Sequence, residues 1–243
     1  MRTRAGDLDS VRAFWEAESC GERYGRADAI PDYSAIDDER YRLEPHIADW
    51  AEFDRTFTGR AIEIGLGTAS DYVRNVKRGG SWSGLDLTSR ALGHARNRVP
   101  GARVVQGDAQ RLPVRSDSLD HVYSWGVLLC CPDLQAAVDE VHRVLRRGGT
   151  ATVMLYHVRS WVTLAAWVRW GSWRLIGPRR AANFMESPGT QVVSIGEARK
   201  LFERFSEVVV EPVHTTWDTR WVGPIGRLGG RHLGWHVVCR ATK

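Results

Sequence analysis

Cysteine is scarce in this sequence of 243 residues, which has only Cys20, Cys130, Cys131 and Cys239. Their spacing matches no zinc-binding pattern, and adjacent residues such as Cys130 and Cys131 are poorly placed for a disulfide. No basic partner that would activate either thiol of this pair as a nucleophile flanks them in the sequence. We therefore expect free thiols, no bound metal and a reducing, cytoplasmic environment.

Long apolar runs and blocks of like charge are also missing. The most apolar stretch, residues 161–176, is interrupted by Arg169 and Arg174 and is a poor candidate for a membrane span. Arg2 and Arg4 precede no apolar run, so we expect no signal peptide. The net charge is +5, but acidic and basic residues are interleaved, and this pattern does not require a nucleic-acid partner.

Glycine, in contrast, stands where a ligand-binding loop needs it, in the segment RAIEIGLGTASD of residues 60–71. The apolar run Ala61–Ile64 predicts a strand that breaks at Gly65 and Gly67 and leads into a helix. Glycines allow a sharp turn and a close ligand, and the amides at the start of the helix face that ligand. Ser70 stands where a dinucleotide fingerprint has its third glycine, so that fingerprint matches only in part.

Acidic residues follow the next two predicted strands. Asp86 lies at the end of the second strand, about twenty residues beyond the glycine loop, where a carboxylate accepts hydrogen bonds from ribose hydroxyls. The same position serves NAD, so Asp86 by itself does not identify the cofactor. A second acid, in Gly107-Asp108-Ala109, follows the third strand.

Taken together, these motifs resemble the class I S-adenosylmethionine-dependent methyltransferases. Glu63-Ile64-Gly65-Leu66-Gly67 matches the E-x-G-x-G pattern of that family, with Ala69 at its usual third glycine. Residues 119–133, LDHVYSWGVLLCCPD, resemble its fourth strand and the loop that contacts the methionine end of the cofactor. The resemblance covers residues 60–156 and weakens toward residue 213.

The resemblance implies S-adenosylmethionine (SAM) as the cofactor. Asp108 would accept a hydrogen bond from the adenine amino group, and the Ala109 amide would donate one to the ring. The full set of implied cofactor contacts is Glu63, Gly65, Leu66, Gly67, Thr68, Asp71, Asp86, Leu87, Asp108, Ala109, Ser124 and Trp125.

Strands alternating with helices predict an α/β fold, a Rossmann-like sheet of seven mostly parallel strands with helices on both faces. The expected strands are residues 61–64, 81–85, 103–105, 119–124, 150–156, 208–213 and 235–240. We divide the chain into an N-terminal helical lid (1–58), the SAM-binding core (59–157), a tryptophan-rich cap insertion (158–190) and the C-terminal part of the core (191–243). The lid is expected to contain a helix over residues 41–57, and a helix that only covers the sheet is the alternative.

A sulfonium methyl group is already electrophilic, so the protein mainly aligns the acceptor and excludes water. A hydroxyl or ammonium acceptor also needs a base, and histidine is the natural candidate. We select His157, after the fifth strand, and His46, in the predicted lid, with a substrate contact or a structural hydrogen bond as the alternative. Arg23, Tyr24 and Tyr156 are candidate substrate contacts.

The insertion at residues 158–190 contains four of the eleven tryptophans of the chain. We predict that Trp167 and Trp170 line a cap that excludes water and holds an apolar or ring-bearing acceptor. Ser187–Thr190 is expected to be its return turn. The alternatives are a helix packed on the core, and a membrane contact, which the lack of a separate polar face disfavours.

The leading functional hypothesis is SAM-dependent methylation of a small molecule such as a specialised metabolite. An RNA or protein methyltransferase, a non-catalytic SAM-binding protein and a NAD-dependent oxidoreductase are the alternatives. Ser70 and Asp108-Ala109 disfavour the oxidoreductase. Residues 124–127, SWGV, lack the Pro-Pro-aromatic motif of enzymes that methylate amino groups of adenine or glutamine. The oligomeric state is left open.

Overall fold

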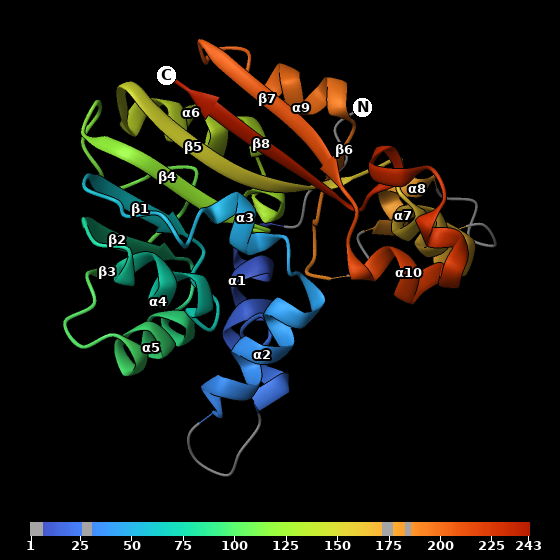
Figure 1. The fold of residues 1–243 in the computed structure, drawn as a ribbon, viewed down its shortest axis with the longest axis horizontal. Helices are drawn as coiled ribbons and strands as arrows, with labels where there is room; N and C mark the ends of the chain where they lie inside the picture. Colours follow the sequence, from blue (N-terminus) through green and yellow to red (C-terminus); the bar gives the residue numbers. More distant parts are fainter. Residues whose placement is uncertain (1–6, 26–30, 172–176, 183–185) are drawn as a thin grey trace.

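The computed structural model of this chain describes residues 7–25, 31–171, 177–182 and 186–243. Its strands are β1 Arg60–Ile64, β2 Ser81–Asp86, β3 Val104–Gln106, β4 Leu119–Trp125, β5 Leu145–His157, β6 Val192–Val193, β7 Glu207–Val213 and β8 His236–Thr242. They form one sheet in the order β3-β2-β1-β4-β5-β8-β7, with β6 paired to β5 (Figure 1). The first six strands pair in parallel, and β8 runs antiparallel to β5 and β7.

This architecture confirms the predicted Rossmann-like, mostly parallel sheet with one correction, because the sheet has eight strands and not seven. The additional strand is β6. Its two residues are too few to produce an alternating sequence pattern, and it forms only because they pair with Tyr156 and His157 at the end of β5.

Helices cover both faces of the sheet. They are α3 Ile47–Ala51, α4 Ser70–Lys77 and α5 Ser89–Arg98 on one face, and α6 Leu134–Val144 and α9 Ile195–Leu201 on the other. Successive strand residues point to opposite faces. Accordingly, the neighbours Ala61 and Ile62 of β1 belong to different apolar clusters, the first with α3, α4 and α5, the second with α6 and α9.

The segment before β1 contains α1 Leu8–Ala17, α2 Tyr33–Leu43 and α3. The prediction of a single helix over residues 41–57 is wrong, since α2 has nearly ended where that helix was to begin. Pro45 has no backbone N–H, and the preceding Glu44 is driven out of the helical region, with φ of −129°. Glu52, with φ of 54°, then ends α3.

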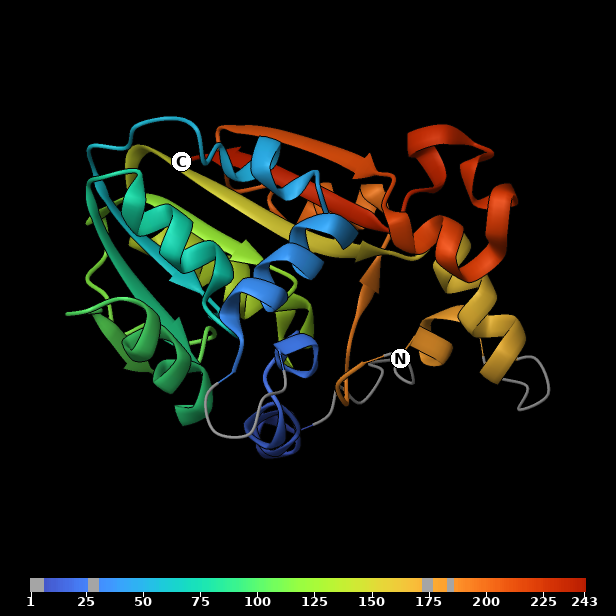
Figure 2. The same ribbon diagram turned by 60° about the horizontal axis from the view of Figure 1, so that its bottom comes forward.

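The chain after β5 forms α7 Trp161–Ala166, a π-helical turn Trp167–Gly171 and α8 Pro178–Ala182. Trp173 lies outside the described residues. A further helix that was not predicted, α10 Thr216–Val222, packs against α7, and the group lies beyond the carboxyl end of β5 (Figures 1 and 2). The predicted return turn at Ser187–Thr190 is present, with the Thr190 amide donating to the Ser187 carbonyl at 3.2 Å.

Within the described ranges, every helix is too short or too polar to cross a bilayer.

Candidate cofactor and acceptor site

A cavity of about 750 Å³ opens at the carboxyl ends of the parallel strands. The glycine loop and the ends of β2, β4 and β5 line it from the sheet side. The N-terminal helices α1 and α2 close over the same edge of the sheet, as the tilted view shows (Figure 2). Ligands of parallel α/β sheets bind in this position, outside the carboxyl ends of the strands.

The glycine loop approaches the neighbouring β4 loop very closely. Gly65 has φ of +84°, and a Cβ atom placed on it would lie 2.0 Å from Cγ2 of Val127. Gly67 also has positive φ, but a Cβ atom there would meet nothing closer than 3.7 Å. The first glycine is therefore required by packing, and the second mainly by backbone conformation.

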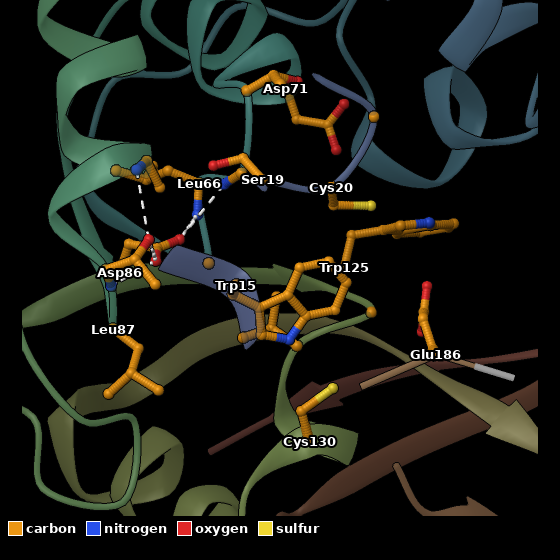
Figure 3. A pocket seen from close by; sticks show the side chains of 18 of the residues that line it. Trp15, Ser19, Cys20, Leu66, Asp71, Asp86, Leu87, Trp125, Cys130 and Glu186 are labelled. Carbon is orange, nitrogen blue, oxygen red and sulfur yellow. Dashed lines mark hydrogen bonds between the residues drawn. The ribbon is translucent and has the colours of Figure 1, made fainter. Parts of the chain in front are cut away.

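Asp86 holds the glycine loop in place. One carboxylate oxygen accepts from the Leu66 amide at 2.7 Å and the Gly67 amide at 3.3 Å. The other accepts from the amide and hydroxyl of Thr88, the N-cap residue of α5 (Figure 3). The side chain lines the cavity and is 9% exposed, so its oxygens still reach the cavity surface.

Asp108 and Ala109 line the cavity beyond β3, beside Leu87. The Asp108 carboxylate accepts from the backbone amide and side-chain amide of Gln110, at 2.9 and 3.0 Å. Among the described residues these are its only side-chain hydrogen-bond partners, so it remains able to accept from a ligand.

Asp71 connects the core to the N-terminal helices. Its oxygens accept a bidentate pair of bonds from Arg40 and single bonds from the Tyr41 and Tyr123 hydroxyls. Burial alone would raise the pKa of Asp71, but the Arg40 charge and these hydrogen bonds hold it below its ordinary value. A carboxylate so fully bonded is a fixed negative charge in the first turn of α4, and it binds the last turn of α2.

Glu63 lies deeper in the same wall and is 2% exposed. It accepts from the Asn75 side chain at 2.7 Å. Burial, together with the nearby Asp71 charge, raises the pKa of Glu63 well above its ordinary value. The environment of Glu63 therefore disfavours its charged form.

Most of the predicted site residues come together around the cavity. Those that line it are Arg23, Tyr24, Glu63, Gly65, Leu66, Gly67, Thr68, Asp71, Asp86, Leu87, Asp108, Ala109, Trp125 and Tyr156. Five predicted residues do not line it, namely His46, Ser124, His157, Trp167 and Trp170. Ser124 instead donates to the Ile64 carbonyl and ties β4 to β1.

Neither selected histidine lies where a base could reach an acceptor in the cavity. His157 is 2% exposed, its Nδ1 is bonded to the Gly234 carbonyl, and burial lowers its pKa. His46 Nε2 faces His236 Nδ1 at 3.1 Å, and burial lowers the pKa of His46 to about 3. The structure corrects both assignments, because a buried neutral imidazole bonded to a structural partner is a poor proton acceptor.

The aromatic walls are also built differently from the prediction. Trp167 and Trp170 lie on the π-helical turn outside the cavity, and Trp170 packs edge-on against Trp221, with 5.6 Å between ring centroids. Trp217 and Trp221 of α10, with Trp235 before β8, line the cavity instead. All three lie near the C-terminus in the sequence. The packing of α10 on α7 brings Trp217 and Trp221 to the site, and the pairing of β8 with β5 brings Trp235 there.

Two carboxylates that the sequence analysis missed face the cavity, Glu44 and Glu186. Glu44 accepts from the indole N–H groups of Trp125 and Trp217, at 3.1 and 3.3 Å. Glu186 accepts from the Tyr156 hydroxyl at 2.9 Å. Both lie in irregular segments with no motif around them, so no local signal marked them.

Glu44, His46 and His236 form the one group of three potential metal ligands found among the described residues. Two histidines and one carboxylate are a known metal-binding set. In this structure a hydrogen bond joins the two imidazoles, and two indole N–H groups already contact the carboxylate. These contacts use Nε2 of His46 and Nδ1 of His236, whereas the buried Nε2 of His236 has no hydrogen-bond partner among the described residues.

The cysteines at the end of β4 are structural in character. Cys130 and Cys131 are buried, and burial raises the pKa of Cys130 to about 12. A thiol so far from ionising is a poor nucleophile at neutral pH.

Comparison with known proteins identifies the central part of the chain. A family model described as "Methyltransferase domain" matches residues 62–153. The chain is 27% identical over 221 residues to the biotin biosynthesis bifunctional protein BioHC of Cellvibrio japonicus, covering 84% of this chain and 43% of that protein. It is 36% identical over 90 residues to a phthiotriol/phenolphthiotriol dimycocerosates methyltransferase of Mycobacterium tuberculosis, covering 36% of this chain and 33% of that protein. The chain thus spans less than half of either relative.

Solved structures share the fold. A SAM-dependent methyltransferase from Thermotoga maritima, described as a possible histamine N-methyltransferase, matches with a TM-score of 0.59 at 23% identity, over 84% of this chain and 93% of its own. A SAM-dependent methyltransferase from Mesorhizobium loti matches with a TM-score of 0.61 at 20% identity, over 81% of this chain and 98% of its own.

The residues that match the family model thus carry the glycine loop, Asp86 and Asp108, and bring them together around one cavity. Residues 62–153 therefore match a methyltransferase domain, and the chain shares its fold with class I S-adenosylmethionine-dependent methyltransferases of solved structure.

Proposed function

We propose that this protein transfers the methyl group of SAM to a small-molecule acceptor by in-line displacement at the sulfonium. The observation that carries the proposal is that one cavity has two chemically different ends. The glycine loop, Asp86 and Asp108 line one end, and Trp125, Tyr156 and the α10 tryptophans line the other. A volume of about 750 Å³ is large enough for a cofactor and a small acceptor together.

At the first end we assign the ribose to Asp86, and the adenine to Asp108 and Ala109. The Arg23 guanidinium donates a hydrogen bond to the Tyr24 hydroxyl at 3.2 Å. Both side chains line the cavity and suit the cofactor carboxylate. The sulfonium then points toward Trp125 and Tyr156. Walls formed by α1, α2 and α10 exclude water from the methyl group, and this favours attack by a bound acceptor.

A small acceptor fits this geometry better than RNA or protein, because the helices before β1 and after β5 enclose the site. The curated relatives support a metabolite acceptor too, since they are named for biotin biosynthesis and for phthiotriol dimycocerosates.

Calorimetry with SAM, S-adenosylhomocysteine (SAH) and NAD tests the cofactor assignment. We expect the first two to bind and NAD not to bind. Asp108→Ala should weaken SAH binding by about 1–3 kcal/mol, roughly 5- to 150-fold in Kd. Asp108 is preferred to Asp86 for this purpose, because Asp86 also holds the glycine loop.

Transfer of labelled methyl groups to a panel of metabolite acceptors tests the activity. Tight binding of NAD, or unchanged SAH affinity in Asp108→Ala, would refute the cofactor assignment. Label transferred to RNA or protein but to no small molecule would refute the acceptor class.

A further inference from the structure

The acceptor end of the cavity is lined by aromatic rings in fixed positions. Trp125 and Trp217 are both held by hydrogen bonds to Glu44. Tyr156 is stacked on Trp235, with 4.2 Å between centroids and 21° between planes, and Trp221 completes the wall. Rings held in this way lose little entropy on binding a ligand, and aromatic side chains are the groups that bind organic cations in proteins.

The charge of the cavity points the same way. Seven carboxylate side chains line it, but only two guanidinium groups and no lysine or histidine do so among the described residues. Arg40 is committed to Asp71. Arg23 lies over the ring of Tyr24, toward the proposed cofactor carboxylate. The acceptor end therefore presents the acidic side chains of Glu44 and Glu186 without a lysine, arginine or histidine of its own among the described residues.

Glu186 is the carboxylate best placed to meet an acceptor. In the close-up it lies across the pocket from Asp86, near Cys130 and beyond Trp125, on the side we assign to the methyl group (Figure 3). Its described side-chain hydrogen-bond donor is the Tyr156 hydroxyl, and no arginine or lysine of the described residues forms an ion pair with it. Within the described ranges, the protein thus bonds one carboxylate oxygen of Glu186, and the other can accept from a ligand.

The surroundings of Glu186 suit proton transfer. Burial raises the pKa of Glu186 to about 7, and the Glu44 charge adds to this, while the Tyr156 hydroxyl and Arg23 act to lower it. The other titratable groups near it, Cys20 and Cys130, are thiols that remain neutral. A carboxylate that titrates near neutral pH is an effective general base.

Resting on the proposed function, we infer that the acceptor is an amine carrying an apolar or aromatic body. The aromatic wall and the carboxylates of Glu44 and Glu186 would bind it as the ammonium ion, and Glu186 would receive its proton.

The step balances as follows. The ammonium N–H proton moves to the Glu186 carboxylate, which leaves a neutral amine with a free lone pair. That lone pair forms a bond to the methyl carbon as the carbon–sulfur bond breaks, and the electron pair of that bond stays on the sulfur of SAH. The adjacent sulfonium charge lowers the pKa of the bound ammonium and so favours the first transfer. Glu186 then releases the proton to solvent.

A matched set of probes tests the recognition without depending on turnover. We would titrate the SAH-bound protein with 2-(1-naphthyl)ethylamine, the corresponding alcohol and the corresponding carboxylic acid, and follow tryptophan fluorescence. At pH 8 the amine should bind at least tenfold more tightly than the alcohol, and the acid should bind weakest. Equal affinities, or preference for the alcohol or acid, overturn the inference.

Glu186→Gln keeps the size of the side chain and removes its charge. We expect it to abolish the preference for the amine and to leave SAH affinity unchanged. Glu203→Gln is the matched control. Glu203 is exposed and lies just after α9, so this variant should behave as wild type. If Glu186→Gln weakens SAH binding instead, the carboxylate serves the cofactor and the inference is wrong.

The rate of methyl transfer to the amine should fall below pH 7 in the wild type, as Glu186 becomes protonated, and should be low and independent of pH in Glu186→Gln. A wild-type pH profile in that variant overturns the proton-transfer role. Methylation of the alcohol in preference to the amine overturns the amine inference but leaves the proposed methyltransferase function intact. Failure of SAH to bind would overturn the proposed function itself.

Discussion

At the scale of single residues, backbone conformation matters as much as side-chain chemistry at this site. Gly65 combines a positive φ with a 2.0 Å approach to Val127, whereas Ala69, where the family has its third glycine, adopts φ of 62° as the cap of α4. One left-handed alanine is tolerated at modest cost, although Ala69 is buried. A side chain at Gly65 meets both strain and a clash.

Gly65→Ala should therefore reduce both stability and cofactor binding. The strain and displacement of Val127 should cost about 2–4 kcal/mol of unfolding free energy. Thermal unfolding and SAH calorimetry would measure the two effects. Gly93→Ala is the matched control, because Gly93 lies inside α5 with no heavy atom within 4 Å of its added Cβ. It should stabilise the protein by about 0.5–1 kcal/mol. Similar losses in both variants would contradict the steric argument.

At the scale of elements, α2 is attached to the core by polar contacts more than by a shared apolar core. Arg40 and Tyr41 of α2 bind Asp71 of α4, and Arg98 of α5 binds Asp37 at 2.5 Å. The α2 sequence, YSAIDDERYRL, has few apolar residues, and Ile36 and Leu43 are its buried positions. These ion pairs thus decide where the helix sits over the cavity.

Arg40→Gln should destabilise the protein by about 3 kcal/mol at neutral pH, because it leaves Asp71 buried and charged without a partner. For a chain of this size that is a fall of roughly 6–12 °C in Tm. The pKa of Asp71 in the folded protein lies below its ordinary value of 3.8. Its contribution is therefore complete above about pH 4 and is lost as the pH falls through the folded pKa.

The difference in Tm between wild type and Arg40→Gln should accordingly narrow as the pH is lowered below 4. The exposed pair of Arg12 and Asp9, 3.7 Å apart, offers the control, and Arg12→Gln should change stability by less than about 0.5 kcal/mol. An Arg40→Gln protein as stable as the wild type at pH 7 would show that α2 is held by other contacts.

The tryptophans of α10 and the π-helical turn should differ in their effects on the acceptor. Trp221→Ala removes a wall of the cavity and should raise the acceptor KM about tenfold or more, with SAH affinity unchanged. Trp170→Ala acts only through its edge contact with Trp221 and should have a smaller effect. Trp167→Ala should leave the KM within about twofold of wild type. Equal effects in Trp167→Ala and Trp221→Ala would restore the original prediction for the insertion.

At the scale of the whole molecule, one cavity is assembled from segments far apart in the chain. Residues of α1, α2, the glycine loop, β5 and α10 all line it. A ligand that fills the cavity therefore contacts several of these elements at once. Ligand binding should stabilise all of them together.

Hydrogen exchange with and without SAH would measure this coupling. At a hundredfold excess over Kd, SAH should stabilise the fold by about 2.7 kcal/mol. Protection should increase in α1 and α2 as well as in the glycine loop. Protection confined to the loop would mean that the N-terminal helices do not close over the cofactor.

The sequence by itself determined the sheet, the cofactor loop and the acids at the strand ends. These depend on local signals, since the glycine turn, the alternation of strands with helices and the Thr88 cap of α5 are encoded within a few residues. Asp86 and Asp108, selected from the sequence, both line the cavity in the structure.

Only the tertiary structure decided the acceptor end. Glu44, Glu186 and the tryptophans at 217, 221 and 235 meet there through long-range packing of α10 on α7 and through hydrogen bonds between segments as far apart as Glu44 and Trp217. The same packing buried His157 and His46, which looked available for catalysis in the sequence. Such contacts join residues that have no pattern in common along the chain, because their positions depend on where separate elements dock and not on local conformational preference.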